Sequence, residues 1–223
     1  MSASQPLAVI FDVDGVLIDS YTPHFQSWQE IARDYGIDYT EAMFATGFGR
    51  TSREIVATQW NRPELSADEI RKIDDAKEAA YRRIVSGNFP AMPGATELVS
   101  ALHAAGFRIA VGSSGPPENV DLAIEKLKLE PWLSARVTGR DVTRGKPDPQ
   151  VFLIAADRLG VPRERCAVVE DAPAGVAAAK AAGMACVGFP STGRTRTDVA
   201  AADLIIGRLS DLSPETFRGL IEK

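Results

Sequence analysis

Two aspartates separated by one residue follow a short apolar run near the start of the chain. The run, residues 7–11, leads directly into Asp12, Asp14 and Gly15. Side chains two positions apart in an extended chain point to the same side, so both carboxylates can face one site. Gly15 permits a tight turn and a close approach of backbone N–H groups to an anion. Taken alone, the pair fits either reacting carboxylates or the solvated aspartates that are common in turns.

A second acidic pair, Glu170 and Asp171, ends another apolar run and is followed by a helical pattern. If both runs are parallel strands, the two acidic ends lie at the same edge of one sheet. Four carboxylates converging there would repel one another unless a hard cation binds, and their oxygen atoms suit Mg²⁺. Asp171 by itself could simply cap the following helix. Helix capping explains neither Glu170 nor the matching Asp12, so the two pairs together favour a metal site.

Two further expected strand ends carry groups that can bind phosphate. Ser113 and Ser114 lie between an apolar run and a helical pattern, and a hydroxyl with free N–H groups at a helix start can hold an anion. Lys146 stands between a glycine and a proline before another helical pattern, so its backbone is restricted and its ammonium can be aimed. A serine-rich turn is usually only a turn, and a lone lysine is usually solvated. The occurrence of all these groups at expected strand ends indicates a catalytic site.

Apolar runs of strand length alternate with helical patterns along most of the chain. We expect strands at residues 7–11, 108–112, 136–138, 166–169, 185–187 and 204–206. Several runs are continuously apolar, as in parallel strands that are covered on both faces. The alternation predicts an α/β fold with a doubly wound parallel (Rossmann-like) sheet and an active site outside the carboxyl ends of the strands.

Two helices of this fold have start or stop signals. Asp148 followed by Pro149 offers an N-cap and a first-turn proline for a helix over residues 151–159, which Gly160 would close. A second helix is expected over residues 174–182, with Gly183 as its C-cap.

Residues 20–89 break the alternation, because they contain helical patterns and no good strand. Ser66 and Glu69 have the spacing of a capping box. The helix that follows has one largely apolar face, in which Lys77 is the polar member. We therefore predict two domains: a catalytic core of residues 1–19 and 90–223, and an inserted small all-helical cap domain of residues 20–89.

Composition and charge indicate which kinds of partner the protein can bind and in which compartment. The 223 residues suffice for one α/β core with an inserted subdomain, and the net charge of -5 argues against a nucleic-acid partner. No run approaches the ~20 apolar residues of a membrane span. Cys166 and Cys186 have neither metal-ligand spacing nor a disulfide framework, and we expect them to be buried thiols. The sequence therefore predicts a cytoplasmic protein that binds neither nucleic acid nor membrane, and a monomer is the default expectation for its oligomeric state.

These motifs, in this order and context, resemble those of the haloacid dehalogenase superfamily over nearly the whole chain. The resemblance implies that Asp12 is a nucleophile that forms an aspartyl-phosphate. It implies that Asp14 is the general acid and base, and that Asp14 also gives its backbone carbonyl to Mg²⁺. Four further roles follow from it, namely phosphoryl binding by Ser113 and Lys146 and metal binding by Glu170 and Asp171. The implied cofactor is Mg²⁺, and the implied substrate is a small phosphorylated metabolite.

The resemblance also narrows the branch of the family. Dehalogenases lack the aspartate that matches Asp14, because a halide leaving group needs no proton, so dehalogenation is disfavoured. The helical insertion is similar to the caps of β-phosphoglucomutases and sugar phosphatases, in which a histidine matching His24 helps to select the sugar. A local contact within its own helix is the other interpretation of His24. Arg53 (or Arg50) and Arg83 lie where cap cations meet a distal phosphate. The expected substrate-binding residues are Gly15, Ser114, His24, Arg53 and Arg83.

The residues after the serine motif favour a phosphatase over a phosphomutase. Mutases of this branch carry polar and basic residues there to hold a second phosphate, whereas this chain has Gly115, Pro116 and Pro117. Prolines have no N–H to donate, and glycine has no side chain. A β-phosphoglucomutase-type mutase remains the alternative.

Two other classes of protein are less favoured. A receiver-type signalling domain also combines acidic residues, a hydroxyl and a lysine, but it is much shorter and has no cap. A non-catalytic binding protein with this fold would be expected to lose Asp12, Asp14 or Lys146, and all three are present.

Overall fold

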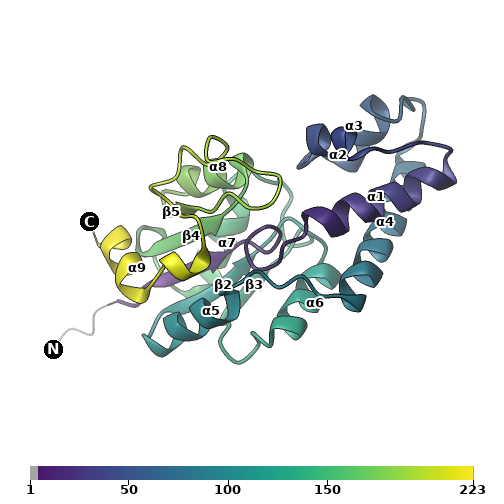
Figure 1. Ribbon diagram of the computed structural model, residues 1–223. Helices are drawn as coiled ribbons and strands as arrows, with labels where there is room; N and C mark the ends of the chain where they lie inside the picture. Colours follow the sequence, from purple (N-terminus) through teal and green to yellow (C-terminus); the bar gives the residue numbers. More distant parts are fainter. Residues whose placement is uncertain (1–4, 223) are drawn as a thin grey trace. The chain divides into compact units, whose positions relative to one another are not determined.

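The computed structural model describes residues 5–222. The chain divides into two compact units: the core unit, which runs up to Asp19 and resumes at Ala91, and the helical unit, Ser20–Pro90. Most of their helices and strands are labelled in Figure 1.

The core unit contains one parallel sheet, which has six strands in the described part of the chain, in the order β3-β2-β1-β4-β5-β6. The strands are β1 (Ala8–Phe11), β2 (Arg108–Gly112), β3 (Ala135–Val137), β4 (Cys166–Glu170), β5 (Ala185–Gly188) and β6 (Leu204–Ile205). The order reverses between β1 and β4, and in doubly wound sheets ligands bind at this switch point. The predicted α/β class and the doubly wound parallel sheet are confirmed.

The range of β2 is as predicted, and the ends of the other strands differ from the predicted ranges by at most one residue. The difference at β4 matters for the site, because β4 extends through Glu170, which still pairs with Gly188 of β5. Glu170 is therefore fixed by the sheet itself and does not belong to the loop that follows.

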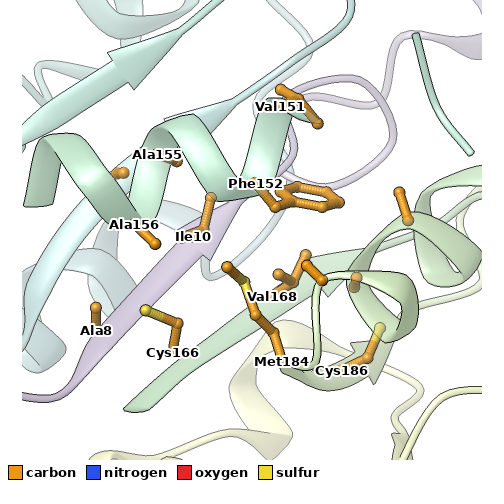
Figure 2. Packing of buried hydrophobic residues seen from close by; sticks show 14 of the residues in the cluster. Ala8, Ile10, Val151, Phe152, Ala155, Ala156, Cys166, Val168, Met184 and Cys186 are labelled. Carbon is orange, nitrogen blue, oxygen red and sulfur yellow. The ribbon is translucent and has the colours of Figure 1, made fainter. Parts of the chain in front are cut away.

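Helices cover the sheet on both faces. They are α5 (Ala95–Ala104), α6 (Pro117–Leu127), α7 (Gln150–Leu159), α8 (Pro173–Ala181) and α9 (Pro214–Ile221), with short 3₁₀ turns at Arg163–Arg165 and Leu209–Asp211. Buried side chains of α7 and α8 form one core with Ile10 of β1 and Val168 of β4 (Figure 2). The alternate residues Val9 and Phe11 point to the other face and are also fully buried. Two covered faces explain why the strands read as continuous apolar runs.

The predicted helix ends need two corrections. Pro149, and not Asp148, occupies the N-cap position of α7, while an Asp148 carboxylate oxygen accepts a hydrogen bond from the Gln150 N–H at 3.0 Å. The helix α8 begins and ends one residue earlier than predicted, and Gly183 follows its C-cap with a φ of 75°.

The helical unit consists of α1 (Tyr21–Asp34), α2 (Glu41–Gly47), α3 (Ser52–Thr58) and α4 (Ala67–Gly87), and residues 20–90, all of them described, contain no strand. The predicted capping box is present at the start of α4, where Ser66 and Glu69 each bond to the backbone of the other. Aromatic side chains fill the interior, and Trp28 and Trp60 meet edge to face with ring centroids 5.7 Å apart.

Two further expectations concern burial and membranes. Cys166 and Cys186 are both buried free thiols, as predicted. Among residues 5–222, no helix combines the length and the apolar character that a bilayer span would require.

Candidate active site

Lys146 joins the carboxyl ends of three neighbouring strands. Its Nζ donates hydrogen bonds to Asp12 Oδ1 at 2.6 Å and to Glu170 Oε1 at 2.5 Å. The backbone carbonyl of Gly112 lies 3.4 Å from the same Nζ. Asp12 follows β1, Gly112 ends β2 and Glu170 ends β4, so one buried ammonium touches the ends of all three strands. The lysine ammonium thus lies at the switch point of the sheet.

An acidic cluster surrounds this lysine. Asp12, Glu170 and Asp171 are only 6%, 1% and 3% exposed, and one carboxylate oxygen from each lies within 4.8 Å of the others. The single charge of Lys146 cannot balance three ionised carboxylates. A buried group of like charges attracts a hard cation, and carboxylate oxygens are the donors that Mg²⁺ prefers. The donor set therefore fits the predicted metal.

Burial and repulsion shift the protonation of the cluster. Burial raises the pKa of Asp12 well above its usual range, and Glu170, Asp171 and Asp14 raise it further, although Lys146 acts in the opposite direction. Burial and the neighbouring Glu170 raise the pKa of Asp171 to about 7. Burial alone would lower the pKa of Lys146, but Asp12 and Glu170 outweigh it and hold this pKa above its ordinary value. Lys146 thus stays charged at neutral pH.

Two glycines make room for the carboxylates. A Cβ at Gly175, in the first turn of α8, would overlap the Glu170 carboxylate, whose Oε2 accepts the Ala172 N–H at 2.8 Å. A Cβ at Gly15 would overlap the carboxylate of Asp171, and Gly15 has a φ of 80°, which favours glycine. The Gly15 N–H donates to the Ile18 carbonyl at 2.8 Å within the turn after β1. Gly15 thus contributes space to the site, while its N–H is engaged in the turn.

Asp14 and the serine motif lie on the β2 side of the cluster. A Cβ built at Gly115 would lie 3.2 Å from Ser113 Oγ and 3.7 Å from Asp14 Oδ2, which places both side chains around Gly115. Ser113 is 2% exposed, and its Oγ accepts the Gly115 N–H at 3.0 Å. Ser114, the next residue, is exposed. The structure therefore brings Asp14 and Ser113 to the same edge of the sheet as Asp12 and Lys146.

The expected residues outside the core all belong to the helical unit. His24 stacks on Tyr81 with ring centroids 4.1 Å apart, and its Nδ1 lies 3.0 Å from Lys77 Nζ. Both of these contacts join α1 to α4, so neither is the contact within its own helix that the second interpretation of His24 expects. Arg83 is exposed and pairs with Glu30 at 2.5 Å.

Arg53, on α3, is exposed. Lys77 is buried at 6% exposure and pairs with Glu78 at 2.6 Å. In the sequence, Lys77 is distinguishable only as the polar member of an apolar helix face.

In the core unit, Ser191 is a site residue that was not expected from the sequence. Its Oγ donates to Asp171 Oδ2 at 2.7 Å from the loop that follows β5. Its position in the sequence could have indicated it. A small hydroxyl residue three positions after a parallel strand lies at the same edge of the sheet as Asp171.

A family model described as haloacid dehalogenase-like hydrolase matches residues 6–183. The chain belongs to this family. The hydrolase is 32% identical over 211 residues to the validoxylamine A 7'-phosphate phosphatase of Streptomyces hygroscopicus subsp. limoneus, covering 91% of this chain and 94% of that protein. It is 31% identical over 214 residues to the β-phosphoglucomutase of Bacillus subtilis, with coverage of 93% and 92%.

A solved structure agrees with the sequence relatives. A family IA, variant 3 hydrolase of the same superfamily from Entamoeba histolytica HM-1:IMSS superposes with a TM-score of 0.89 at 28% identity, covering 97% of this hydrolase and 100% of that chain. The resemblance in the motifs is thus confirmed at the level of the family, in which phosphatases and a phosphomutase are both represented.

The raised pKa of Asp171 predicts how the metal-free hydrolase responds to pH. Its pKa rises from an ordinary 3.8 to about 7 on folding, so the folded protein keeps a proton that the unfolded chain has lost. The contribution of this proton to folding stability is therefore present at low pH, and it is lost as the pH rises through about 7. In EDTA, we expect the free energy of unfolding to fall by about 1 kcal/mol between about pH 6 and about pH 8, which lowers Tm by about 2–4 °C. Thermal denaturation followed by circular dichroism measures this loss.

Two controls accompany that measurement. The Asp171→Asn variant should lack the fall, because the amide does not titrate in this range. Excess Mg²⁺ should raise the Tm of the wild type more at the higher pH, where the carboxylate is ionised. A metal-free Tm that stays level or increases over this interval would contradict the predicted protonation.

Proposed function

We propose that this hydrolase removes phosphate from a small phosphorylated metabolite, of the sugar-phosphate kind, through an aspartyl-phosphate on Asp12. The observation that carries the proposal is the position of Asp12, a buried carboxylate at the switch point held by Lys146 at 2.6 Å. Asp14 and Ser113 lie at the same edge of the sheet. Relatives named as a phosphatase and a phosphoglucomutase support phosphate chemistry on a sugar-like substrate.

The reaction proceeds in two steps. A carboxylate oxygen of Asp12 attacks phosphorus, the bond from phosphorus to the ester oxygen breaks, and Asp14 donates a proton to the leaving alcohol. Asp14, now ionised, takes a proton from a water molecule, which attacks the aspartyl-phosphate and releases inorganic phosphate. Asp12 is regenerated as a carboxylate, and Asp14 regains its proton. The two aspartates thus divide the work of nucleophile and of general acid and base.

Charge and position supply most of the catalysis. Phosphate monoesters hydrolyse so slowly unaided that accelerations of up to ~10²¹ are known, and phosphoryl transfer depends on neutralising the equatorial oxygens. Lys146 provides a fixed positive charge, since its ammonium is buried and its raised pKa keeps it protonated. The Ser113 hydroxyl and the exposed residue Ser114, just before α6, would hold phosphoryl oxygens at the start of that helix.

The metal ligands of this proposal are the carboxylates of Asp12, Glu170 and Asp171 with the backbone carbonyl of Asp14. The three carboxylates are buried, and their oxygens approach one another within 4.8 Å, which fits a small hard cation. When bound, Mg²⁺ would neutralise this cluster and the negative charge of the phosphoryl group. The chain's own contribution is to hold the donors in place, through Lys146 and the space left at two glycines.

Recognition of the rest of the substrate is assigned to the helical unit. His24, Arg53 and Arg83 are the residues that we propose for it, and Arg83 would have to exchange its present partner Glu30. Hydrolysis is preferred to mutase chemistry because a mutase must hold a phosphate at each end of a bisphosphate. Pro116 and Pro117, at the start of α6, offer no N–H groups for a second one. The mutase remains the second candidate, favoured by the relative from Bacillus subtilis.

The proposal also covers the kind of substrate, the oligomeric state and the cellular compartment of the protein. The substrate is a free small molecule, and the protein acts as a monomer in the cytoplasm. Its two buried thiols fit a reducing compartment of this kind.

Replacing the nucleophile should abolish turnover without disturbing the fold. Asp12→Asn keeps the size of the side chain but removes the attacking carboxylate, so kcat on p-nitrophenyl phosphate should fall roughly 10³-fold or more. Asp157→Asn, at an exposed position of α7, is the matched control and should keep wild-type activity. Circular dichroism should show the same helix content in both variants. Substantial residual turnover in Asp12→Asn would exclude a covalent role for this aspartate.

The products formed from β-glucose 1-phosphate separate the two candidate functions. With Mg²⁺ and a catalytic bisphosphate primer, a phosphatase releases inorganic phosphate, whereas a mutase gives glucose 6-phosphate. We expect phosphate release from this or another compound in a panel of sugar phosphates. Formation of glucose 6-phosphate without free phosphate would establish the mutase and overturn the hydrolytic proposal.

A further inference from the structure

The loop after β5 brings a hydroxyl to the acidic cluster, and the reaction steps above do not use it. Ser191 Oγ donates to Asp171 Oδ2 at 2.7 Å. Both side chains are enclosed, with Asp171 3% and Ser191 9% exposed. Hydrogen bonds to a carboxylate in such an environment are strong, because the charge has lost most of its water.

We propose that Ser191 is a positioning residue that fixes the carboxylate of Asp171 in the orientation required for metal binding. This inference rests on the proposed function for the identity of the metal. Carboxylate oxygens of Glu170 and Asp171 lie within 4.8 Å of each other, so an unsupported Asp171 side chain would gain by turning away from Glu170. The Ser191 hydroxyl opposes this rotation, because it donates a hydrogen bond to the carboxylate in its present orientation.

Steric contacts leave Asp171 little freedom to move away from Ser191. A Cβ at Gly15 would overlap the Asp171 carboxylate and would lie 2.7 Å from Ser191 Oγ. The turn after β1 therefore approaches this hydrogen bond as closely as a glycine allows. The Asp171 carboxylate is confined between the Gly15 backbone and the Ser191 hydroxyl, and the hydrogen bond from Ser191 fixes the orientation of its oxygen atoms.

The loop itself is anchored on both sides of Ser191. The Phe189 N–H donates to the Glu170 carbonyl at 2.8 Å, which continues the pairing of β5 with the end of β4. After Ser191, Thr192 Oγ1 donates to Asp19 Oδ2 at 2.8 Å, and the Arg194 N–H donates to the Ser191 carbonyl at 2.9 Å. The serine is thus held in place before a metal arrives, which is how residues behind a metal ligand raise its affinity.

Isothermal titration of the full-length protein with Mg²⁺, in the absence of substrate, tests this role. Ser191→Ala should weaken Mg²⁺ binding by about ten- to a hundredfold, the usual effect of losing such a supporting hydrogen bond. Ser191→Thr keeps the hydroxyl and should restore most of the affinity. Thr192→Ala removes a neighbouring hydrogen bond of the same loop that does not reach Asp171, and it should bind Mg²⁺ like the wild type.

The outcomes separate this role from a general effect on the loop. Equal Mg²⁺ affinity in Ser191→Ala and the wild type, or equal losses in Ser191→Ala and Thr192→Ala, would overturn the proposal. If Ser191→Ala does not fold, Ser191→Cys keeps the size with a weak donor and should show the same direction of change. In kinetics, Ser191→Ala should need more Mg²⁺ for half-maximal rate and should recover its kcat at saturating Mg²⁺.

Separate measurements of Mg²⁺ binding and of phosphate-ester hydrolysis distinguish the role of Ser191 from the phosphatase activity. A wild-type protein that binds Mg²⁺ in a Ser191-dependent way but hydrolyses no phosphate ester would keep the role of Ser191 and refute the phosphatase. A wild-type protein that binds no Mg²⁺ would refute the role of Ser191 directly.

Discussion

The hydrogen bonds from Lys146 to Asp12 and Glu170 hold together the ends of strands whose acidic side chains repel one another. The lysine Nζ lies 2.6 Å from one carboxylate and 2.5 Å from the other, and its side chain is 10% exposed. Buried ion pairs recover little more than the cost of removing their charges from water, so they are weak devices for stability. This cluster also has more negative than positive charge. A binding site for a cation and a phosphate group would account for the free-energy cost of burying these charges. The ion pairs of Lys146 are therefore better explained by function than by stability.

The register of the parallel sheet creates this arrangement. Phe11 of β1 pairs with Val111 of β2 on one side and with Val169 of β4 on the other. The residues that come next, Asp12, Gly112 and Glu170, are therefore brought side by side at one edge. Close approach then depends on positions without a side chain, since a Cβ at Gly15 or Gly175 would overlap a carboxylate. Backbone register and two small residues thus determine where the charges meet.

Much of this was predictable from the sequence, because the core strands are fully buried and leave continuous apolar runs. The acidic pairs and the serine motif each follow such a run, so their meeting at one edge follows from parallel pairing. Lys146 lies nine positions after the end of β3, and its place at this edge depends on the loop between β3 and α7. Ser191 was harder to find, because its contact depends on the path of the loop after β5. The N-cap of α7 was misassigned because Pro149 takes the position expected for Asp148.

The helical unit was predicted less completely, for a different physical reason. Helical periodicity identified the apolar face of α4 and the capping box at Ser66, since both depend on local spacing. The pairing of His24 with Lys77 joins residues of α1 and α4 that are far apart in sequence, and no local pattern encodes it. The roles of His24, Arg53 and Arg83 toward substrate therefore stay predictions.

The most direct test of the central interaction is a double-mutant cycle between Lys146 and Glu170, measured by chemical denaturation of the metal-free protein. Lys146→Met leaves buried carboxylates without their ammonium, and Glu170→Gln removes one source of repulsion together with one ion pair. If the lysine holds the cluster together, the loss of stability in the double variant should be smaller than the summed losses by about 1–3 kcal/mol. Additive losses would show that Lys146 and Glu170 are uncoupled, and would contradict the account.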